Sequence, residues 1–207
     1  MNANYYLDIR ILETSDDADL TIEVLRNQIY SILHGVFRQM PNCFALALET
    51  SPRLRKKMKD AELKYGRAAR ANFDILRIFS AQQSDLEAFI DLIKGNWKIR
   101  DYTVLHVPIP VPTAKITGWK SYRRFRIPTR KAELNLTSNN GQESLHSRRM
   151  KQAKALPYFK VQSQSNGQQF TVSIDIQDTI DAGQGLPDGY GLARKTQAFS
   201  LPTFEAI

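Results

Sequence analysis

The order of secondary-structure elements expected in the first half of the chain most narrows the folds that it can adopt. Four short segments are rich in apolar, β-branched or aromatic residues, and two longer segments repeat apolar residues at helical spacing. We predict strands at 4–11, 43–49, 73–80 and 101–108, and helices at 17–38 and 83–95. The order β-α-β-β-α-β is that of a ferredoxin-like domain. Because this fold carries many unrelated functions, it does not by itself indicate one.

Three closely spaced prolines, Pro108, Pro110 and Pro112, mark a boundary after the last of these strands. We therefore expect an α+β chain of two domains: a ferredoxin-like domain at 1–112, with a basic, helix-prone insertion near 51–71, and a second α+β domain at 113–207. The second domain is expected to hold a basic segment at 115–154, a short basic helix near 143–155 and a β-hairpin at 157–176. With 207 residues and 42% hydrophobic residues, the chain can build the cores that this division requires.

The hairpin is the clearest local pattern in the chain. Asn166-Gly167 lies between two alternating runs, and Asn-Gly is typical of a two-residue type I′ turn because both positions need positive φ. The predicted register pairs Ser165 with Gln168, Ser163 with Phe170, Val161 with Val172, and Phe159 with Ile174. Alternation then places Phe159, Val161, Ser163, Phe170, Val172 and Ile174 on one face, which is apolar at its base and carries Ser163, Ser165 and Phe170 near its tip. An aromatic ring beside hydroxyl groups suits base stacking, although Phe170 could instead simply end the core.

Positive charge is concentrated in two zones of a chain whose net charge is +8. Residues 115–154 carry +9 and residues 53–70 carry +6, so the remainder is acidic. Such zones are typical of a polyanion-binding protein. Solvated faces that keep the protein soluble are the alternative that charge alone leaves open.

Three histidines, His34, His106 and His146, are candidates for general acid–base chemistry near neutral pH. His34 is expected at the end of the first long helix, where the helix C-terminus favours the imidazolium form. His106 is expected to be structural, and His146 lies in the basic segment. The sequence has no HExxH or CxxC motif, no paired acidic cluster and no phosphate-binding loop with its lysine, so we expect no metal and no cofactor.

The single cysteine, Cys43, excludes an intrachain disulfide framework and fits a reducing cytoplasm. The N-terminus alternates and soon turns acidic, unlike a signal peptide. The sequence contains no run of about 18 apolar residues, so we expect no membrane span. We therefore expect a cytoplasmic location without membrane attachment.

Several motifs occur together and in order: YYLDIRI at the N-terminus, Leu33-His34 at the end of the first helix, LPYFKVQSQSNGQQF at 156–170, GYGLA at 189–193 and FSLPTF at 199–204. With these motifs the chain resembles the type I-F CRISPR repeat endoribonucleases. That resemblance implies a metal-independent enzyme that cuts precursor CRISPR RNA at the base of the repeat hairpin by 2′-hydroxyl attack. It also implies a 2′,3′-cyclic phosphate product, continued binding of the mature guide RNA, and association with other subunits of a type I-F effector complex.

The resemblance also implies roles for individual residues. His34 falls at the position of the general base, Ser163 at the position that holds the ribose, and Tyr190 at the position of a tyrosine that orders the site. Ser165 falls where the family makes a polar RNA contact, and Phe170 where an aromatic ring stacks on the nucleotide beside the cut.

The basic region departs from the family pattern. The family reads two base pairs with an Arg-x-Gln pair, whereas this chain has Arg126-Ile127-Pro128, so base reading is partial or shifts to Arg124 or Arg130. The family's arginine-rich helix is shortened to a cluster of Arg148, Arg149, Lys151 and Lys154, which is expected to contact phosphates. The basic insertion, which the family pattern does not require, could take over part of that role.

Two alternatives to a nuclease remain. A non-cutting RNA-binding subunit that caps a guide RNA would use the same basic and stacking residues, but it would not need His34, Ser163 and Tyr190 together. A ribosomal or RRM-like protein should carry aromatic residues in a recognisable motif on its central strands. Tyr5, Tyr6 and Phe44 are present, but no such motif surrounds them.

Overall fold

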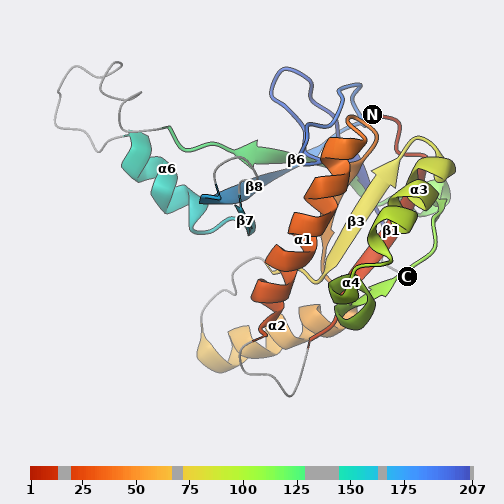
Figure 1. Cartoon of the computed structure of the whole chain (residues 1–207). Helices are drawn as coiled ribbons and strands as arrows, with labels where there is room; N and C mark the ends of the chain where they lie inside the picture. The colour runs from red at the N-terminus through yellow and green to blue at the C-terminus, as the bar shows by residue number, and fades with distance from the viewer. Residues whose placement is uncertain (14–19, 67–71, 129–144, 163–166, 206–207) are drawn as a thin grey trace.

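The N-terminal half of the computed structural model is an antiparallel sheet with helices on one face (Figure 1). The structure describes residues 1–13, 20–66, 72–128, 145–162 and 167–205. The four principal strands, in the sheet order β2-β3-β1-β4, are β2 (Ala45–Glu49), β3 (Ile75–Ser80), β1 (Tyr5–Ile11) and β4 (Thr103–Leu105). A short strand, β5 (Ile109–Pro110), also pairs with β1. This order confirms the ferredoxin-like, α+β prediction.

Two helices supply the apolar layer over this sheet. Helix α1 (Ile22–Gln39) begins at Thr21, whose hydroxyl accepts a hydrogen bond from the Val24 amide at 3.4 Å. Helix α3 (Gln83–Ile93) buries Leu86, Phe89 and Ile93. The two helices meet the sheet in an aromatic cluster, because the Phe89 ring lies 5.9 Å from Phe37 of α1 and 4.9 Å from Phe44.

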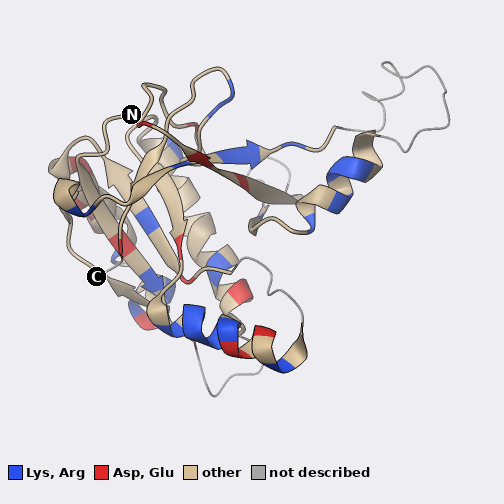
Figure 2. Ribbon diagram, turned by 180° about the vertical axis from the view of Figure 1, so that it is seen from behind, with Lys and Arg blue, Asp and Glu red and all other residues tan. Residues whose placement is uncertain are grey.

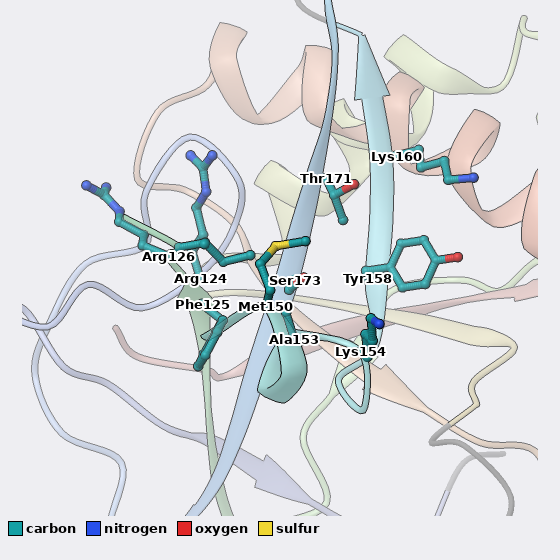
Figure 3. A pocket seen from close by; sticks show the side chains of 11 residues that line it. Arg124, Phe125, Arg126, Met150, Ala153, Lys154, Tyr158, Lys160, Thr171 and Ser173 are labelled. Carbon is teal, nitrogen blue, oxygen red and sulfur yellow. The ribbon is translucent and has the colours of Figure 1, made fainter. Parts of the chain in front are cut away.

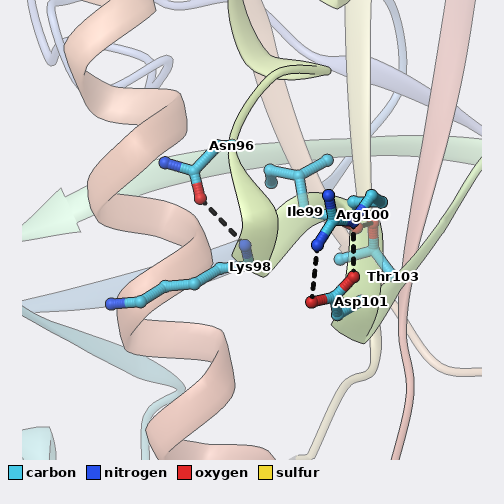
Figure 4. Close-up of polar contacts among 6 residues, drawn as sticks. All are labelled: Asn96, Lys98, Ile99, Arg100, Asp101 and Thr103. Atoms are coloured by element: carbon cyan, nitrogen blue, oxygen red, sulfur yellow. Dashed lines mark hydrogen bonds and ion pairs between the residues drawn. The ribbon is translucent and has the colours of Figure 1, made fainter.

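The segment before β4 differs from the prediction of a strand over 101–108. Residues Trp97–Tyr102 form helix α4, and the strand shortens to Thr103–Leu105. Side chains at both ends close this single helical turn: the Lys98 amide donates to Asn96 Oδ1 at 3.0 Å, and Thr103 Oγ1 donates to the Ile99 carbonyl at 2.6 Å (Figure 4). A six-residue helix is too short to show helical periodicity, so capping decides its structure.

The C-terminal half forms a second antiparallel sheet, in the order β7-β8-β6-β9. Its strands are β7 (Tyr158–Gln162), β8 (Gln169–Thr179), β6 (Gly118–Phe125) and β9 (Leu201–Thr203), and a short 3-10 helix, η1 (Thr113–Lys115), precedes β6. The basic segment therefore contributes a central strand, β6, that sequence reasoning did not predict. We propose that the two sheets correspond to domains at 1–112 and 113–207.

The predicted hairpin register is wrong by two residues. Phe170 lies opposite Val161, and Val172 lies opposite Phe159, so Ser163 is not the partner of Phe170. Within the described residues the pairing ends at Gln162 and Gln169, and Gly167 adopts a positive φ of 70°. An even shift leaves every side chain on its predicted face. Phe159, Val161, Val172 and Ile174 are accordingly all buried.

A buried ion pair links the first sheet to the C-terminal segment. Arg77 of β3 donates from Nε and Nη2 to the two carboxylate oxygens of Asp8 of β1, at 2.7 and 2.8 Å, and from Nη1 to the Phe204 carbonyl at 3.1 Å. The guanidinium carbon also lies 4.1 Å from the centre of the Phe204 ring. Both charged side chains are almost fully shielded from solvent. This contact holds the terminal FSLPTF motif against the sheet.

Two further helices carry the basic zones. They are α2 (Pro52–Tyr65), within the expected insertion, and α6 (Leu145–Ala153), within the expected basic helix. Among the described α-helices, these are the two without a buried residue. Figure 2 shows Lys and Arg gathered on both. None of the described helices has the length and apolar character needed to cross a membrane.

Candidate active site

A row of aromatic rings runs from the second sheet across α1 to the GYGLA motif. Phe159 of β7 stacks on Tyr30 at 3.8 Å between ring centres, and Tyr30 is 6.1 Å from His34, one turn further along α1. The His34 imidazole then stacks on Tyr190 at 4.7 Å with an interplanar angle of 12°. Two of the three predicted catalytic residues are therefore in direct contact.

The backbone of the GYGLA motif is fixed closely enough to hold the Tyr190 ring. Asp188 Oδ1 accepts from the amides of Tyr190 and Leu192 at 2.9 and 3.0 Å. The Tyr30 hydroxyl donates to the Tyr190 carbonyl at 3.1 Å, and the Leu46 amide of β2 donates to the Gly191 carbonyl at 2.8 Å. Only glycine suits position 191, since φ is +74° and an added Cβ would lie 3.0 Å from the Phe37 ring.

The protonation of His34 differs from the expectation for a helix C-terminus. Helix α1 continues to Gln39, so His34 lies more than a turn before its end, and its side chain is half-buried. Burial lowers the pKa of the imidazole below its ordinary value of 6.5, and the positive charges of Arg38 and Arg124 lower it further. The expected preference for imidazolium is wrong, because desolvation and two cations favour the neutral ring, which is the form that can accept a proton.

Arg124 and Phe170 complete the described part of this site. Arg124 lies opposite Ile174 on the inward face of the second sheet, and its guanidinium carbon is 4.7 Å from the centre of the Tyr190 ring and 5.7 Å from that of Phe170. Phe170 meets Tyr190 edge-on at 6.4 Å and is partly buried. A cation and an aromatic edge thus flank the His34–Tyr190 pair. Ser163, Ser165 and Arg130 lie outside the described residues, and their roles stay predictions.

A cavity of about 660 Å³ opens between α6 and the outer face of the second sheet (Figure 3). Its lining includes Arg126 and Lys154, which were predicted to bind RNA. It also includes Tyr158 and Lys160, which were not predicted as site residues. Alternation along β7 places these two side chains on the face of the strand that points away from the buried Phe159 and Val161. The Lys160 amide donates to Asn27 Oδ1 of α1 at 2.8 Å, which ties this strand to the helix that carries His34.

A second cavity, of about 600 Å³, lies beside Asp188 and the strand β6. Its lining contains six cationic side chains against two carboxylates: Arg123, Arg124, Arg126, Arg149, Arg194 and Lys195 against Asp175 and Asp188. Sequence reasoning missed Arg123, Arg194 and Lys195 as site residues. Arg194 and Lys195 directly follow the GYGLA motif, and that position could have indicated them. A bridge between Ala193 and Arg123 joins the motif to β6.

The cationic helix α6 is oriented by one contact to the last residue of β6 and one to the chain after it. The Arg149 guanidinium carbon lies 4.7 Å from the centre of the Phe125 ring. His146 Nδ1 lies 2.8 Å from the Pro128 carbonyl, and because a carbonyl can only accept, this nitrogen carries the proton. Arg148 and Lys151 are exposed on the same helix, and Lys154 follows it.

The other histidine, His106, follows β4 at the edge of the first sheet, where its amide donates to the Asp8 carbonyl at 3.0 Å. Within the described ranges, no three His, Cys, Asp or Glu side chains are grouped so that they could hold a metal ion. The described site is therefore built from one histidine, aromatic rings and cations.

A family model described as CRISPR-associated protein (Cas_Csy4) matches residues 6–204, nearly the whole chain. The chain belongs to this family and is a repeat-processing protein of type I-F CRISPR systems that binds CRISPR RNA. No protein with a curated description matches the chain.

Proposed function

We propose that this protein is a metal-independent endoribonuclease that cuts precursor CRISPR RNA at the base of the repeat hairpin. The observation that carries the proposal is the half-buried His34 imidazole stacked on Tyr190 beside the Arg124 guanidinium, where burial and nearby positive charge lower the pKa of the imidazole. A general base must be unprotonated at the working pH and held in a fixed orientation. The lowered pKa of His34 supports the first requirement and its stacking on Tyr190 supports the second. Family membership supplies the RNA on which such a base would act.

In the proposed reaction, His34 takes the proton from the ribose 2′-hydroxyl upstream of the scissile phosphate. The 2′-oxygen forms a bond to phosphorus while the bond to the 5′-oxygen breaks, and the leaving oxygen takes up a proton. The products are a 2′,3′-cyclic phosphate and a 5′-hydroxyl. Ser163 is proposed to hold the ribose so that the attack is in line, an effect of orientation.

The remaining side chains are proposed to bind and position the RNA. Arg124 would stabilise negative charge on the reacting phosphate from its place over Tyr190, and Phe170, with Ser165, would contact the nucleotide beside the cut. The stem would lie along α6, where Arg148, Arg149, Lys151 and Lys154 meet phosphates, and Arg126 or Arg130 would reach base edges. After cutting, the protein would stay on the guide RNA and join other subunits of a type I-F complex.

The pH dependence of cutting follows from the protonation of His34. The rate should rise as pH increases through the pKa of the free enzyme and then level off, because only the neutral ring accepts a proton. Since burial and the charges of Arg38 and Arg124 lower that pKa, the midpoint of kcat/KM should lie below pH 6.5. Arg38→Gln removes one of these charges and should move the midpoint to higher pH. A midpoint above 6.5, or one that moves downward in Arg38→Gln, would contradict this assignment.

The chemistry of the cut ends tests the proposal. The protein is incubated with hairpin RNA of the repeat encoded beside its gene, in EDTA, and the products are identified by mass spectrometry. The proposal requires an upstream fragment that ends in a 2′,3′-cyclic phosphate and a downstream fragment that begins with a 5′-hydroxyl. An upstream fragment that ends in a 3′-hydroxyl, or cutting that needs added Mg²⁺, would overturn it.

A further inference from the structure

Helix α2 is the largest basic feature that the proposed active site does not use. Its 14 residues include six cations against Asp60 and Glu62, and none of its residues is buried. It arises between β2 and β3 of the first sheet, whereas α6 lies between β6 and β7 of the second sheet, so the two basic helices come from different parts of the fold (Figure 1). A ferredoxin-like domain does not need this helix for its core.

The start of the helix is nonetheless fixed by hydrogen bonds of its N-cap residue, Ser51. Ser51 Oγ accepts from the Leu54 amide at 3.2 Å, the Ser51 amide donates to Asp74 Oδ1 at 2.7 Å, and the Ser51 hydroxyl also donates to the Asp74 carboxylate. Ser51 and Asp74 are both buried. At the other end Gly66 adopts a left-handed conformation, with φ of 62°, that ends the helix. The charged side chains of α2 therefore project from a helix whose two ends are both fixed.

The charge on α2 is arranged against its own helix dipole. The first turn has no acidic residue and instead carries Arg53 and Arg55, although a helix N-terminus is itself positive and favours anions. Helical spacing places Lys56 and Lys59 away from the partly buried stripe of Leu54, Met58 and Ala61. Among the described residues only Lys57 of this helix forms an ion pair, with Glu13 at 2.6 Å.

An outward row of Arg53, Lys56 and Lys59 thus adds positive charge to a positive helix end, with no carboxylate pair for these three in the described part of the chain. This arrangement costs stability in the free protein, and a bound polyanion would offset it. The same combination, a basic helix without buried residues, occurs in α6, which faces the RNA in the proposed function. The charge complementarity of α2 therefore favours the phosphate backbone of RNA over a protein partner.

The place of α2 favours RNA outside the hairpin. Lys57 of α2 pairs with Glu13, which lies in the segment between β1 and α1, and Arg26 of α1 donates from Nη1 to Asn72 Oδ1, in the segment between α2 and β3, at 2.5 Å. These contacts place α2 on the side of the N-terminal end of α1 (Figure 1). His34 lies further along α1, roughly 18 Å from its first residue at the helical rise per residue. We infer that α2 binds the phosphates of the single-stranded RNA that flanks the repeat hairpin. This inference rests on the proposed function for the position of the hairpin.

The test compares three RNAs in filter binding: the minimal repeat hairpin, and the same hairpin with about eight added nucleotides on its 5′ or its 3′ side, a length within the range of single-strand binding sites. All carry a 2′-deoxy sugar at the cut to prevent cleavage. The variant is Arg53→Gln/Lys56→Gln/Lys59→Gln. The control, Lys94→Gln/Lys98→Gln/Lys115→Gln, makes the same charge change outside α2 and α6.

We expect one flank to tighten binding by the parent protein, and the two flanked RNAs identify which one. The α2 variant should lose that gain, with roughly tenfold weaker binding and a salt slope smaller by about 2, since each single-strand phosphate contact contributes about 0.7. Both variants should bind the minimal hairpin like the parent, and the control should keep the gain.

Equal affinity of the parent for all three RNAs, or an α2 variant that keeps the gain and the salt slope, would overturn the inference. The second result would leave an acidic protein surface as the partner of α2. Loss of binding to the minimal hairpin by the parent would instead contradict the proposed function, so the two failures are distinguishable.

Discussion

His34→Ala should slow cutting of the repeat hairpin by about 10²–10⁴-fold, the contribution of a well-placed general base, while binding stays within about twofold of the parent. The reason is that the imidazole acts on the ribose proton and contributes little to phosphate contact. Single-turnover cleavage at saturating protein measures the first quantity, and the Kd for a hairpin with a 2′-deoxy sugar measures the second.

His106→Ala is the matched control, since it removes a half-buried imidazole at the edge of the first sheet, after β4. We expect it to cut at the parental rate. Cleavage by His34→Ala at the parental rate, or an equal loss in both variants, would remove His34 from the reaction. A circular dichroism spectrum and an unfolding midpoint close to the parent show that the fold survives the change.

Asp8→Ala should destabilise the protein by about 3–5 kcal/mol, because it leaves the guanidinium of Arg77 buried without its counter-charge. The Arg77 side chain has no exposed surface, and its other hydrogen bond in the described structure goes to the Phe204 carbonyl. Urea unfolding at pH 7 measures the loss. The C-terminal segment should be loosened with it, since Arg77 also donates to the Phe204 carbonyl and lies over the Phe204 ring.

Two companion variants show whether the buried charge causes this effect. Asp8→Leu/Arg77→Met removes both charges and should recover much of the loss, because apolar groups of similar size replace a desolvated pair. Asp101→Ala removes a carboxylate that also lies 2.7 Å from an arginine, Arg100, but on the surface (Figure 4), and should leave stability unchanged. A small loss in Asp8→Ala would show that water or another group compensates Arg77.

The architecture of the first half could be predicted because its elements are long and regular. Helices α1 and α3 and strands β1, β2 and β3 each show several apolar repeats, and tertiary packing follows those repeats. Helix α4 was missed because one capped turn shows no period. Strand β6 was missed because its alternation, GWKSYRRF, sets cations between aromatic residues and reads as a basic segment.

The hairpin shows how a wrong register can still give the right faces. The Asn-Gly turn predicted pairs that are two residues out of step, but a shift of two keeps the alternation, so Phe159, Val161 and Phe170 stay on the predicted side. The local claim that Ser163 faces Phe170 fails for the same reason. Turn chemistry indicates where a chain reverses, whereas strand packing on α1 decides which residues pair.

The site itself could be named only in part from the sequence. The family resemblance pointed to His34, Tyr190 and Phe170. The stacking of His34 on Tyr190, which are distant along the chain, depends on tertiary contacts such as the hydrogen bond from the Leu46 amide of β2 to the Gly191 carbonyl. The protonation preference of His34 was wrong because burial and Arg124 come from the tertiary structure. The second basic cavity was missed because β6 and the chain after GYGLA are neighbours only in the folded protein.

The central claim is that His34 activates a ribose hydroxyl, and one substitution in the RNA tests it most directly. Two repeat hairpins that differ only in a 2′-deoxy sugar at the cut are mixed with saturating protein in EDTA, and cleavage is followed in a single turnover. We predict complete cutting of the all-ribose hairpin and no cutting of the deoxy hairpin, which should bind equally well. Cleavage of the deoxy hairpin at the same position would show that the 2′-hydroxyl is not the nucleophile, and no cleavage of either would leave a protein that caps its guide RNA without cutting it.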